Sequence, residues 1–327
     1  MNAIRKIGVL TSGGDAPGMN ACLRAVVKSA LANGVGVLGI QDGYQGLIEG
    51  RLQPLSYLEV NNIIHLGGTI LGSARSKEFL TVDGRQKAIE HLRRNEVDGL
   101  VLIGGDGTFA GGTVLSGEMN IPIIGIPGTI DNDIAGTQYT IGYDTCLNTV
   151  IDAVDKIRDT ASSHHRVFFV EVMGRNSGYI ALNAAIASGA ENVLLPESHT
   201  DIEQLAAAIR TQNKGVRSSI IIVAEGDDGG GALEIMEKVR PYLKEYDLRH
   251  SVLGHIQRGG RPSASDRILA TRMGAFAVES LINGKSNVMV GIQNDELLLQ
   301  KIGEGSTSNA ALSLSRLDLL RSMLTKG

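Results

Sequence analysis

Short apolar runs alternate repeatedly with helical patterns along the first part of the chain. Apolar runs at residues 6–10, 35–40, 100–103 and 121–126 are separated by stretches that include helical apolar patterns. Strands that alternate with helices pair in parallel through right-handed crossovers. The sequence therefore predicts a doubly wound, mostly parallel α/β sheet in this part of the chain.

A second series of the same kind follows a long helical pattern at about residues 144–162. The helix has one apolar stripe, formed by Leu147, Val150, Ile151, Val154 and Ile157. Further strands are predicted at residues 167–172, 193–195, 219–224 and 251–253. Because 327 residues are many for one hydrophobic core, we expect two doubly wound α/β domains with mostly parallel sheets, joined near residues 136–143.

Two turns rich in glycine and aspartate follow the apolar runs at residues 100–103 and 121–126. Their sequences are Gly104-Gly105-Asp106-Gly107-Thr108 and Pro127-Gly128-Thr129-Ile130-Asp131-Asn132-Asp133. Glycine lets backbone N–H groups approach phosphate oxygens closely, because it has no Cβ and accepts positive φ. A strand-end carboxylate can also anchor the Mg²⁺ that neutralises phosphates. The turns therefore indicate phosphoryl transfer at the carboxyl edge of the sheet.

The second turn ends in two carboxylates, Asp131 and Asp133. In one interpretation Asp131 is a general base, and Asp133 is a helper or a metal-side carboxylate. In the other, the segment is a solvated turn with local Asx hydrogen bonds. The buried run before it and the acidic turn around Asp106 favour the catalytic interpretation.

Loop arginines could provide the anion-binding groups. They lie beside the predicted strands, at Arg75, Arg166, Arg175, Arg249, Arg258 and Arg261. The planar guanidinium suits phosphate oxygens and stays charged at any working pH. A single loop arginine is more often a surface ion pair, so the interpretation depends on their shared position at strand ends.

Charge and cysteine content exclude several other classes. The net charge of −4 gives no reason to expect nucleic acid or a membrane surface as a partner. No apolar stretch of membrane-spanning length and no export signal is visible. Cys22 and Cys146 lack metal-ligand spacing and are expected to be reduced, buried thiols. These features predict a cytoplasmic enzyme.

Segments spread along the chain together resemble the bacterial ATP-dependent 6-phosphofructokinase family. They are TSGGDAPGMN at 11–20, GGTILGSAR at 67–75, IGGDGT at 103–108, PGTIDND at 127–133, EVMGR at 171–175 and GHIQRGG at 254–260. The resemblance runs in order from residue 7 to about residue 293. PGTIDND and GHIQRGG are the specific motifs, since GGDGT also occurs in NAD and lipid kinases. The resemblance implies transfer of the γ-phosphoryl group of Mg-ATP to the 1-hydroxyl of fructose 6-phosphate, the committed step of glycolysis.

The resemblance also implies a role for individual residues. Asp131, Arg175 and Thr129 would be catalytic, with Asp131 accepting the hydroxyl proton, and Asp106 would hold Mg²⁺. The ATP site would be formed by Gly14, Arg75, Ser76, Gly105, Asp106, Gly107 and Thr108. The sugar phosphate would contact Thr129, Ile130, Asp131, Arg166, Met173, Gly174, Arg175, Glu225, Arg249, His255, Ile256, Gln257 and Arg258.

Assembly and regulation are further implications of the resemblance. The family forms homotetramers in which the counterparts of Arg166 and Arg249 reach the 6-phosphate in a neighbouring subunit. The ATP-binding domain would comprise residues 1–142 and 257–307, and the sugar-binding domain residues 143–256 and 308–327.

An effector, either ADP or GDP or phosphoenolpyruvate, would bind at a site formed by Arg24, Lys28, Arg158, Gly189, Glu191, Lys214 and Arg217. Arg24 and Lys28 are four residues apart on one helix face, so an ordinary solvated basic face remains the alternative. Tyr57 and Val216 replace basic residues that complete this pocket in other members, and Leu80 replaces an arginine near the nucleotide.

Three other functions are disfavoured by particular residues. A pyrophosphate-dependent relative would typically carry aspartate at Gly107 and lysine at Gly128, so the two glycines favour ATP. A regulatory subunit without catalysis is disfavoured by the presence of Asp106, Asp131 and Arg175. A lipid or NAD kinase would not be expected to carry PGTIDND together with GHIQRGG.

Overall fold

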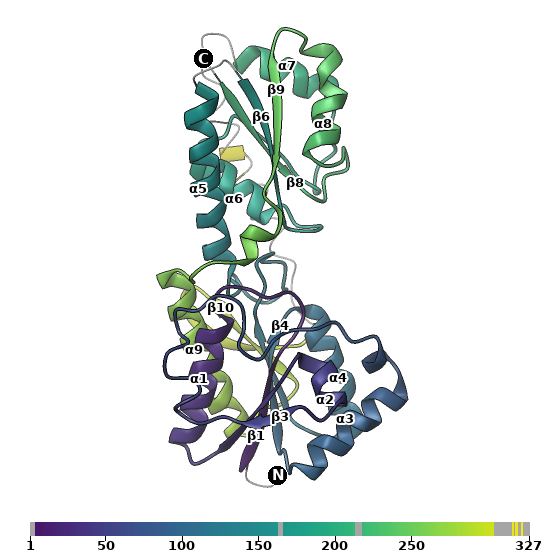
Figure 1. Ribbon diagram of the computed structural model, residues 1–327, viewed down its shortest axis with the longest axis vertical. Helices are drawn as coiled ribbons and strands as arrows, with labels where there is room; N and C mark the ends of the chain where they lie inside the picture. Colours follow the sequence, from purple (N-terminus) through teal and green to yellow (C-terminus); the bar gives the residue numbers. More distant parts are fainter. Residues whose placement is uncertain are drawn as a thin grey trace. The chain divides into compact units, whose positions relative to one another are not determined.

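The computed structural model describes residues 4–162, 166–212 and 218–303, and also Arg316, Asp318, Leu319 and Ser322. The chain divides into two compact units (Figure 1). The first contains Met1–Ile130, Ile134–Thr145 and Arg258–Ser306, and the second contains Asp131–Asp133, Cys146–Gln257 and Thr307–Gly327.

The first unit contains a seven-stranded sheet with the order β11-β10-β5-β4-β1-β2-β3. Its strands are β1 (Lys6–Thr11), β2 (Gly36–Ile40), β3 (Leu52–Pro54), β4 (Gly99–Gly104), β5 (Ile123–Pro127), β10 (Val288–Gln293) and β11 (Glu296–Lys301). Pairing is parallel from β10 to β2, and only the edge strands β3 and β11 pair antiparallel. The carboxyl ends of β1, β4 and β5 therefore meet at one edge of this sheet.

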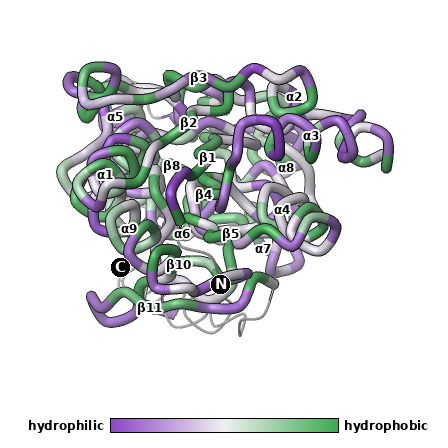
Figure 2. The backbone as a smooth tube through the Cα atoms, turned by 90° about the horizontal axis from the view of Figure 1, so that it is seen from below, coloured by the Kyte–Doolittle hydropathy of each residue, from purple (hydrophilic) through white to green (hydrophobic). Residues whose placement is uncertain are grey.

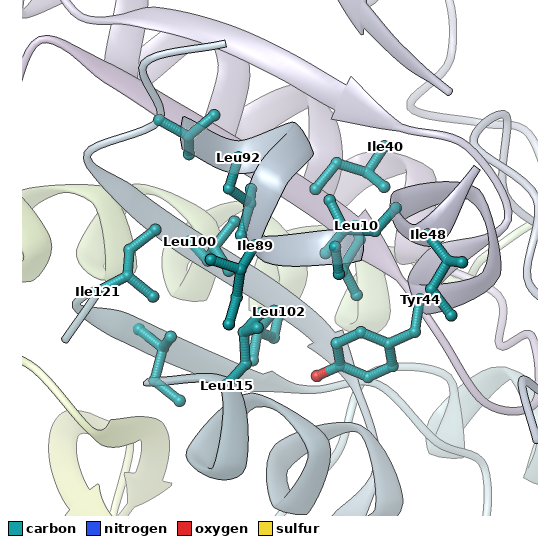
Figure 3. Close-up of a cluster of buried hydrophobic side chains, with 14 of the residues drawn as sticks. Leu10, Ile40, Tyr44, Ile48, Ile89, Leu92, Leu100, Leu102, Leu115 and Ile121 are labelled. Carbon is teal, nitrogen blue, oxygen red and sulfur yellow. The ribbon is translucent and has the colours of Figure 1, made fainter. Parts of the chain in front are cut away.

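Helices cover both faces of the seven-stranded sheet. One face carries α1 (Met19–Ala32) and α9 (Ala264–Ile282), and the other carries α2 (Gly43–Ile48), α3 (Val82–Arg94) and α4 (Asp106–Met119), as Figures 1 and 2 show. Leu100 and Leu102, two positions apart on β4, point to the same side and pack with Leu10, Ile89 and Leu115 (Figure 3). This apolar core holds α4 against the strand that precedes it.

The second unit contains a four-stranded parallel sheet with the order β7-β8-β6-β9. Its strands are β6 (Arg166–Val172), β7 (Asn192–Leu194), β8 (Ser219–Ala224) and β9 (Asp247–Val252). The helices are α5 (Tyr143–Ser162), which begins in the first unit, and α6 (Tyr179–Ser188), α7 (Ile202–Gln212) and α8 (Ala232–Val239). Of the short 3₁₀ helices, η2 (Arg240–Tyr242) lies in this unit, η3 (Gly254–Arg258) begins in it, and η1 (Glu78–Leu80) lies in the first unit. Phe169, Ile221 and Val223 of the sheet pack on α7 and α8.

The expected fold class, two α/β domains with mostly parallel sheets, is confirmed. Some local predictions were wrong. Asp106, Gly107 and Thr108 open helix α4 instead of lying in a turn. The strand predicted at residues 251–253 is β9, which begins at Asp247, because β9 is an edge strand with exposed polar residues that hide the apolar pattern.

The cysteine prediction is confirmed, since Cys22 and Cys146 are both buried and neither forms a disulfide bond. No helix in the described part of the chain is long and apolar enough to cross a membrane.

Candidate active site

The first unit joins a glycine turn to the start of a helix at the carboxyl edge of its sheet. The turn at residues 12–15 follows β1, and α4 follows the neighbouring strand β4. Ser12 N donates to Ile103 O at 3.1 Å, and Thr108 Oγ1 donates to Ser12 O at 3.1 Å. A helix N-terminus attracts anions through its backbone N–H groups and its dipole. This edge is therefore suited to bind phosphate groups.

At this edge of the sheet, packing excludes a side chain at Gly104 but not at Gly107. A Cβ at Gly104 would meet Thr108 Oγ1 at 2.4 Å and Ser12 O at 2.5 Å, so close packing excludes a side chain there. At Gly107 a Cβ would meet no protein atom within 4 Å, and φ is not positive. Neither packing nor backbone conformation requires glycine at position 107. The absent side chain leaves open space beside the exposed Asp106.

Asp106 is a suitable carboxylate for a metal that arrives with a nucleotide. Among the described residues, no group of three or more His, Cys, Asp or Glu side chains could hold a metal ion by itself. Mg²⁺ usually keeps several waters and binds through one or two carboxylates together with substrate phosphates. A single exposed carboxylate at a helix N-terminus fits that mode.

The other residues expected at the nucleotide site have varied surroundings. Arg75 is exposed. Ser76 Oγ donates to Gln45 Oε1 at 2.7 Å and accepts from Phe79 N at 3.1 Å, so its hydroxyl supports the start of η1. Tyr44, on α2, donates its hydroxyl to Thr108 O at 2.5 Å and thereby braces α4. No sequence motif indicated this role of Tyr44.

Arg258 lies beside the 12–15 turn of the first unit. Its Nη1 donates to Asp15 O at 3.3 Å, and a Cβ at Gly14 would meet the same nitrogen at 2.1 Å. Gly14 therefore makes room for the arginine. The family resemblance implies that Arg258 contacts the sugar phosphate. In the structure it lies beside the turn at residues 12–15, which is expected at the nucleotide site.

In the second unit, Arg175 is held in an unusual backbone conformation after β6. Its φ is 52°, and the φ of Gly174 is 142°. Arg175 N donates to Glu225 Oε1 at 2.8 Å, while a Cβ at Gly226 would lie 1.9 Å from Arg175 O. A non-glycine residue with positive φ stores strain and persists where its surroundings hold it in place. Glu225 and Gly226, at the end of the neighbouring strand β8, hold this turn.

The strained turn presents Arg175 to Asp131. Arg175 Nε lies 3.6 Å from Asp131 Oδ2, and the arginine side chain is 56% exposed whereas the aspartate side chain is 3% exposed. Asn132, next to Asp131, is buried and has a φ of 50°. Desolvation raises the pKa of Asp133, against the opposing effects of a backbone hydrogen bond and the Arg175 charge. The structure thus places a buried carboxylate against an exposed cation.

Gln257 links two of the expected sugar-binding segments. Its side chain is fully buried in η3, where Oε1 accepts from Met173 N at 3.2 Å and Nε2 donates to Gly254 O at 3.0 Å. His255 and Ile256 of the same segment are exposed. In this conformation Gln257 contacts the protein on both sides of its amide, whereas His255 and Ile256 are accessible.

Arg166 and Arg249 flank a single carboxylate. Arg166 Nε lies 2.8 Å from Asp247 Oδ2, and Arg249 Nε lies 3.1 Å from Asp247 Oδ1. These contacts lower the pKa of Asp247. Arg166 begins β6 and Arg175 follows its end, so the strand rise separates the two positions by about 20 Å. One sugar phosphate would not span both positions within one chain.

The described residues expected at the effector site belong to different units, Arg24 and Lys28 to the first and Arg158, Gly189 and Glu191 to the second. Arg158 Nη1 lies 2.9 Å from Glu191 Oε1, and its Nη2 donates to Gly189 O at 2.8 Å. On α1, Lys28 Nζ lies 5.9 Å from the centre of the Tyr57 ring. Within the described chain, Nε of Arg24 and Nε of Arg158 are buried without a hydrogen-bond partner. Lys214, Val216 and Arg217 lie outside the described residues.

Comparison with known proteins gives consistent matches. The family described as Phosphofructokinase matches residues 6–281. ATP-dependent 6-phosphofructokinase 2 of Bacteroides thetaiotaomicron is 53% identical over 299 residues, which is 91% of this chain and 92% of the relative. ATP-dependent 6-phosphofructokinase 1 of Thermus thermophilus is 54% identical over 302 residues, 92% of this chain and 94% of the relative.

Solved structures show the same fold. Phosphofructokinase from Saccharomyces cerevisiae has a TM-score of 0.88 and 34% identity, covering 98% of this chain and 48% of that one. The chain thus spans about half the length of the yeast chain. A pyrophosphate-dependent phosphofructokinase from Marinobacter aquaeolei shares the fold, with a TM-score of 0.81 and 23% identity. The match covers 93% of this chain and 84% of that one. By sequence and by fold, the chain belongs to the phosphofructokinase family.

Proposed function

We propose that the chain is an ATP-dependent 6-phosphofructokinase, which converts fructose 6-phosphate and ATP to fructose 1,6-bisphosphate and ADP. The observation that carries the proposal is the contact of buried Asp131 with exposed Arg175, 3.6 Å apart, on a turn held in a strained conformation. Relatives about half identical over nine tenths of the chain are named for this activity.

Asp131 is the general base. As the 1-hydroxyl oxygen of the sugar attacks the γ-phosphorus, a new O–P bond forms, the bond to the β-phosphate oxygen breaks, and the proton passes to the Asp131 carboxylate. Arg175 neutralises charge on the transferring group, as its exposed guanidinium allows. Thr129, whose carbonyl accepts from Thr140 Oγ1 at 2.6 Å, precedes the base on a constrained segment.

The nucleotide binds at the start of α4 and the 12–15 turn. Gly14, Gly105, Gly107 and Thr108 bring the backbone to the phosphates, with Arg75 and Ser76 beside them. Bound through Asp106 and the phosphates, Mg²⁺ would supply charge neutralisation. The open space at Gly107 supports ATP over pyrophosphate, since nothing in the protein itself requires glycine there.

The sugar phosphate contacts residues of two subunits in a homotetramer. Ile130, Met173, Gly174, Glu225, His255, Ile256, Gln257 and Arg258 serve it in one chain, and Arg166 and Arg249 bind its 6-phosphate from the neighbouring chain. Their pairing with one aspartate leaves a net positive charge for the phosphate. The position of Arg166 at the opposite end of β6 from Arg175 supports this division.

The proposed enzyme also has an effector site. ADP, GDP or phosphoenolpyruvate binds near Arg24, Lys28, Arg158, Gly189 and Glu191, with Lys214 and Arg217, and the enzyme works in the cytoplasm. The cationic side chains among these residues suit a ligand that carries phosphate or carboxylate groups.

A coupled assay that compares ATP with pyrophosphate as phosphoryl donor tests the function. Purified protein with Mg²⁺ should phosphorylate fructose 6-phosphate with ATP and be much slower with pyrophosphate. Faster turnover with pyrophosphate would reverse the donor assignment. No turnover with either donor would favour a regulatory subunit.

A further inference from the structure

We propose that Asp266 is a positioning residue for the catalytic turn, acting through the segment at residues 140–145. The inference rests on the proposed function. Asp266 lies in the first turn of α9, in neither of the two specific sequence motifs, and has no assigned role in the reaction. It contacts backbone that leads to the catalytic turn.

The Asp266 carboxylate is buried and accepts hydrogen bonds from one short segment. The residue is 1% exposed. Its Oδ1 accepts from Gly142 N at 2.8 Å, and its Oδ2 accepts from Thr145 N at 2.8 Å and from Thr145 Oγ1 at 2.5 Å. Burying a carboxylate is costly unless hydrogen bonds compensate. Burial raises the pKa of Asp266, and these hydrogen bonds oppose that rise.

The start of α9 reinforces the same connection. Ser263 Oγ accepts from Asp266 N at 3.2 Å, and Ser263 N donates to Thr145 Oγ1 at 2.9 Å. Gly142 has a φ of 105°, and a Cβ there would lie 2.7 Å from Ala16 Cβ. The segment therefore has little freedom to shift while the carboxylate holds it.

The segment held by Asp266 is itself bonded to the end of β5. Ile141 N donates to Pro127 O at 2.9 Å, and Ile141 forms a bridge with Gly128. Thr140 Oγ1 donates to Thr129 O at 2.6 Å. The chain continues from Thr129 to Asp131. The connection thus runs from α9 through residues 140–145 to the backbone immediately before the catalytic base.

Asp266→Asn tests the proposal. Asparagine has one oxygen and an NH₂ group, so the amide opposes at least one N–H or O–H donor that the carboxylate satisfied. We expect kcat to fall by about 10- to 100-fold, since small displacements of reacting groups have effects of that order. KM for ATP should change by less than about two-fold, because the proposed nucleotide site is formed mainly by the turn at residues 12–15 and the start of α4.

Asp98→Asn is the matched control. Asp98 Oδ2 also accepts two backbone N–H groups, from Arg5 at 2.8 Å and Lys6 at 2.9 Å, but at the start of β1, away from the carboxyl edge. It should lower the melting temperature without changing kcat. A folded Asp266→Asn protein with kcat within two-fold of wild type would overturn the proposal. So would an equal loss of kcat in both variants.

Variants of Thr145 and Thr140 keep the proposal testable if Asp266→Asn does not fold. Thr145→Val removes the hydroxyl bond to Asp266, whereas Thr145→Ser retains it. Thr145→Val should therefore lower kcat, whereas Thr145→Ser should keep kcat close to the wild-type value. Thr140→Val should lower kcat too, and combining it with Thr145→Val should lower kcat less than the product of the single effects, because both act along one connection. The proposal would be refuted if the effects of Thr140→Val and Thr145→Val on kcat simply multiplied. It would also be refuted if Thr145→Val and Thr145→Ser had the same kcat. Wild-type activity in the same assay tests the proposed function separately.

Discussion

Replacing Gly107 by alanine should affect stability and nucleotide binding in opposite directions. A Cβ at this position meets no protein atom within 4 Å, and the backbone is not in the left-handed region. Alanine within a helix is favoured over glycine by about 0.5–1 kcal/mol. For a chain of this size, such a change would raise the melting temperature by about 1–3 °C.

The same methyl group would occupy the space proposed for the nucleotide phosphates. Filling a close contact costs about 1–3 kcal/mol, so KM for ATP should rise by about 5- to 150-fold. Gly107→Asp should weaken ATP binding further, because its carboxylate would face a nucleotide phosphate. Two like charges 4 Å apart repel by about 4 kcal/mol at an effective dielectric constant of 20. That corresponds to a loss of ATP affinity on the order of 10³-fold.

Gly117→Ala provides the control on the same helix. A Cβ at Gly117 also meets nothing within 4 Å, and the residue lies near the other end of α4. Both alanine variants should melt at or above the wild-type temperature by scanning calorimetry, but only Gly107→Ala should raise KM for ATP in the coupled assay. An unchanged KM in Gly107→Ala, or an equal rise in both variants, would show that the space at position 107 does not belong to the nucleotide.

Further substitutions test the remaining roles. Asp131→Asn should lower kcat by at least about 10²-fold in a protein that still folds and binds fructose 6-phosphate, and near wild-type turnover would remove it as the base. Arg249→Ala should raise KM for the sugar by about 10- to 100-fold, and subunit exchange with Asp131→Asn should restore some activity if sites are shared. Tyr44→Phe should lower the free energy of unfolding, measured in urea, by about 0.5–1.5 kcal/mol, because the bond to Thr108 O is lost. An effector should change the apparent affinity for fructose 6-phosphate by a factor near the weak end of a roughly 5- to 150-fold range. Arg158→Ala should abolish this response, and an unchanged response would place the effector elsewhere.

Local patterns in the sequence determined the sheet class and the glycine-rich ends of two neighbouring strands. The buried runs before Gly104 and Gly128 predicted parallel strands with glycine-rich ends, and β4 and β5 lie there. This worked because side-chain periodicity and glycine conformation act within a few residues. The same reasoning failed at β9, where edge exposure removes the apolar pattern.

Contacts between distant segments were decided only by the tertiary structure. Nothing near Arg175 in the sequence indicated that Glu225 and Gly226, fifty residues later, would hold its left-handed backbone. Nor did the sequence indicate that Asp266 would hold residues 142–145, or that Arg258 would fill the space beside Gly14. These contacts depend on which strand lies next to which, and that order follows from the packing of the whole domain. The residue types at the strand ends can thus be read from local sequence, whereas which of them come into contact depends on how the domain packs.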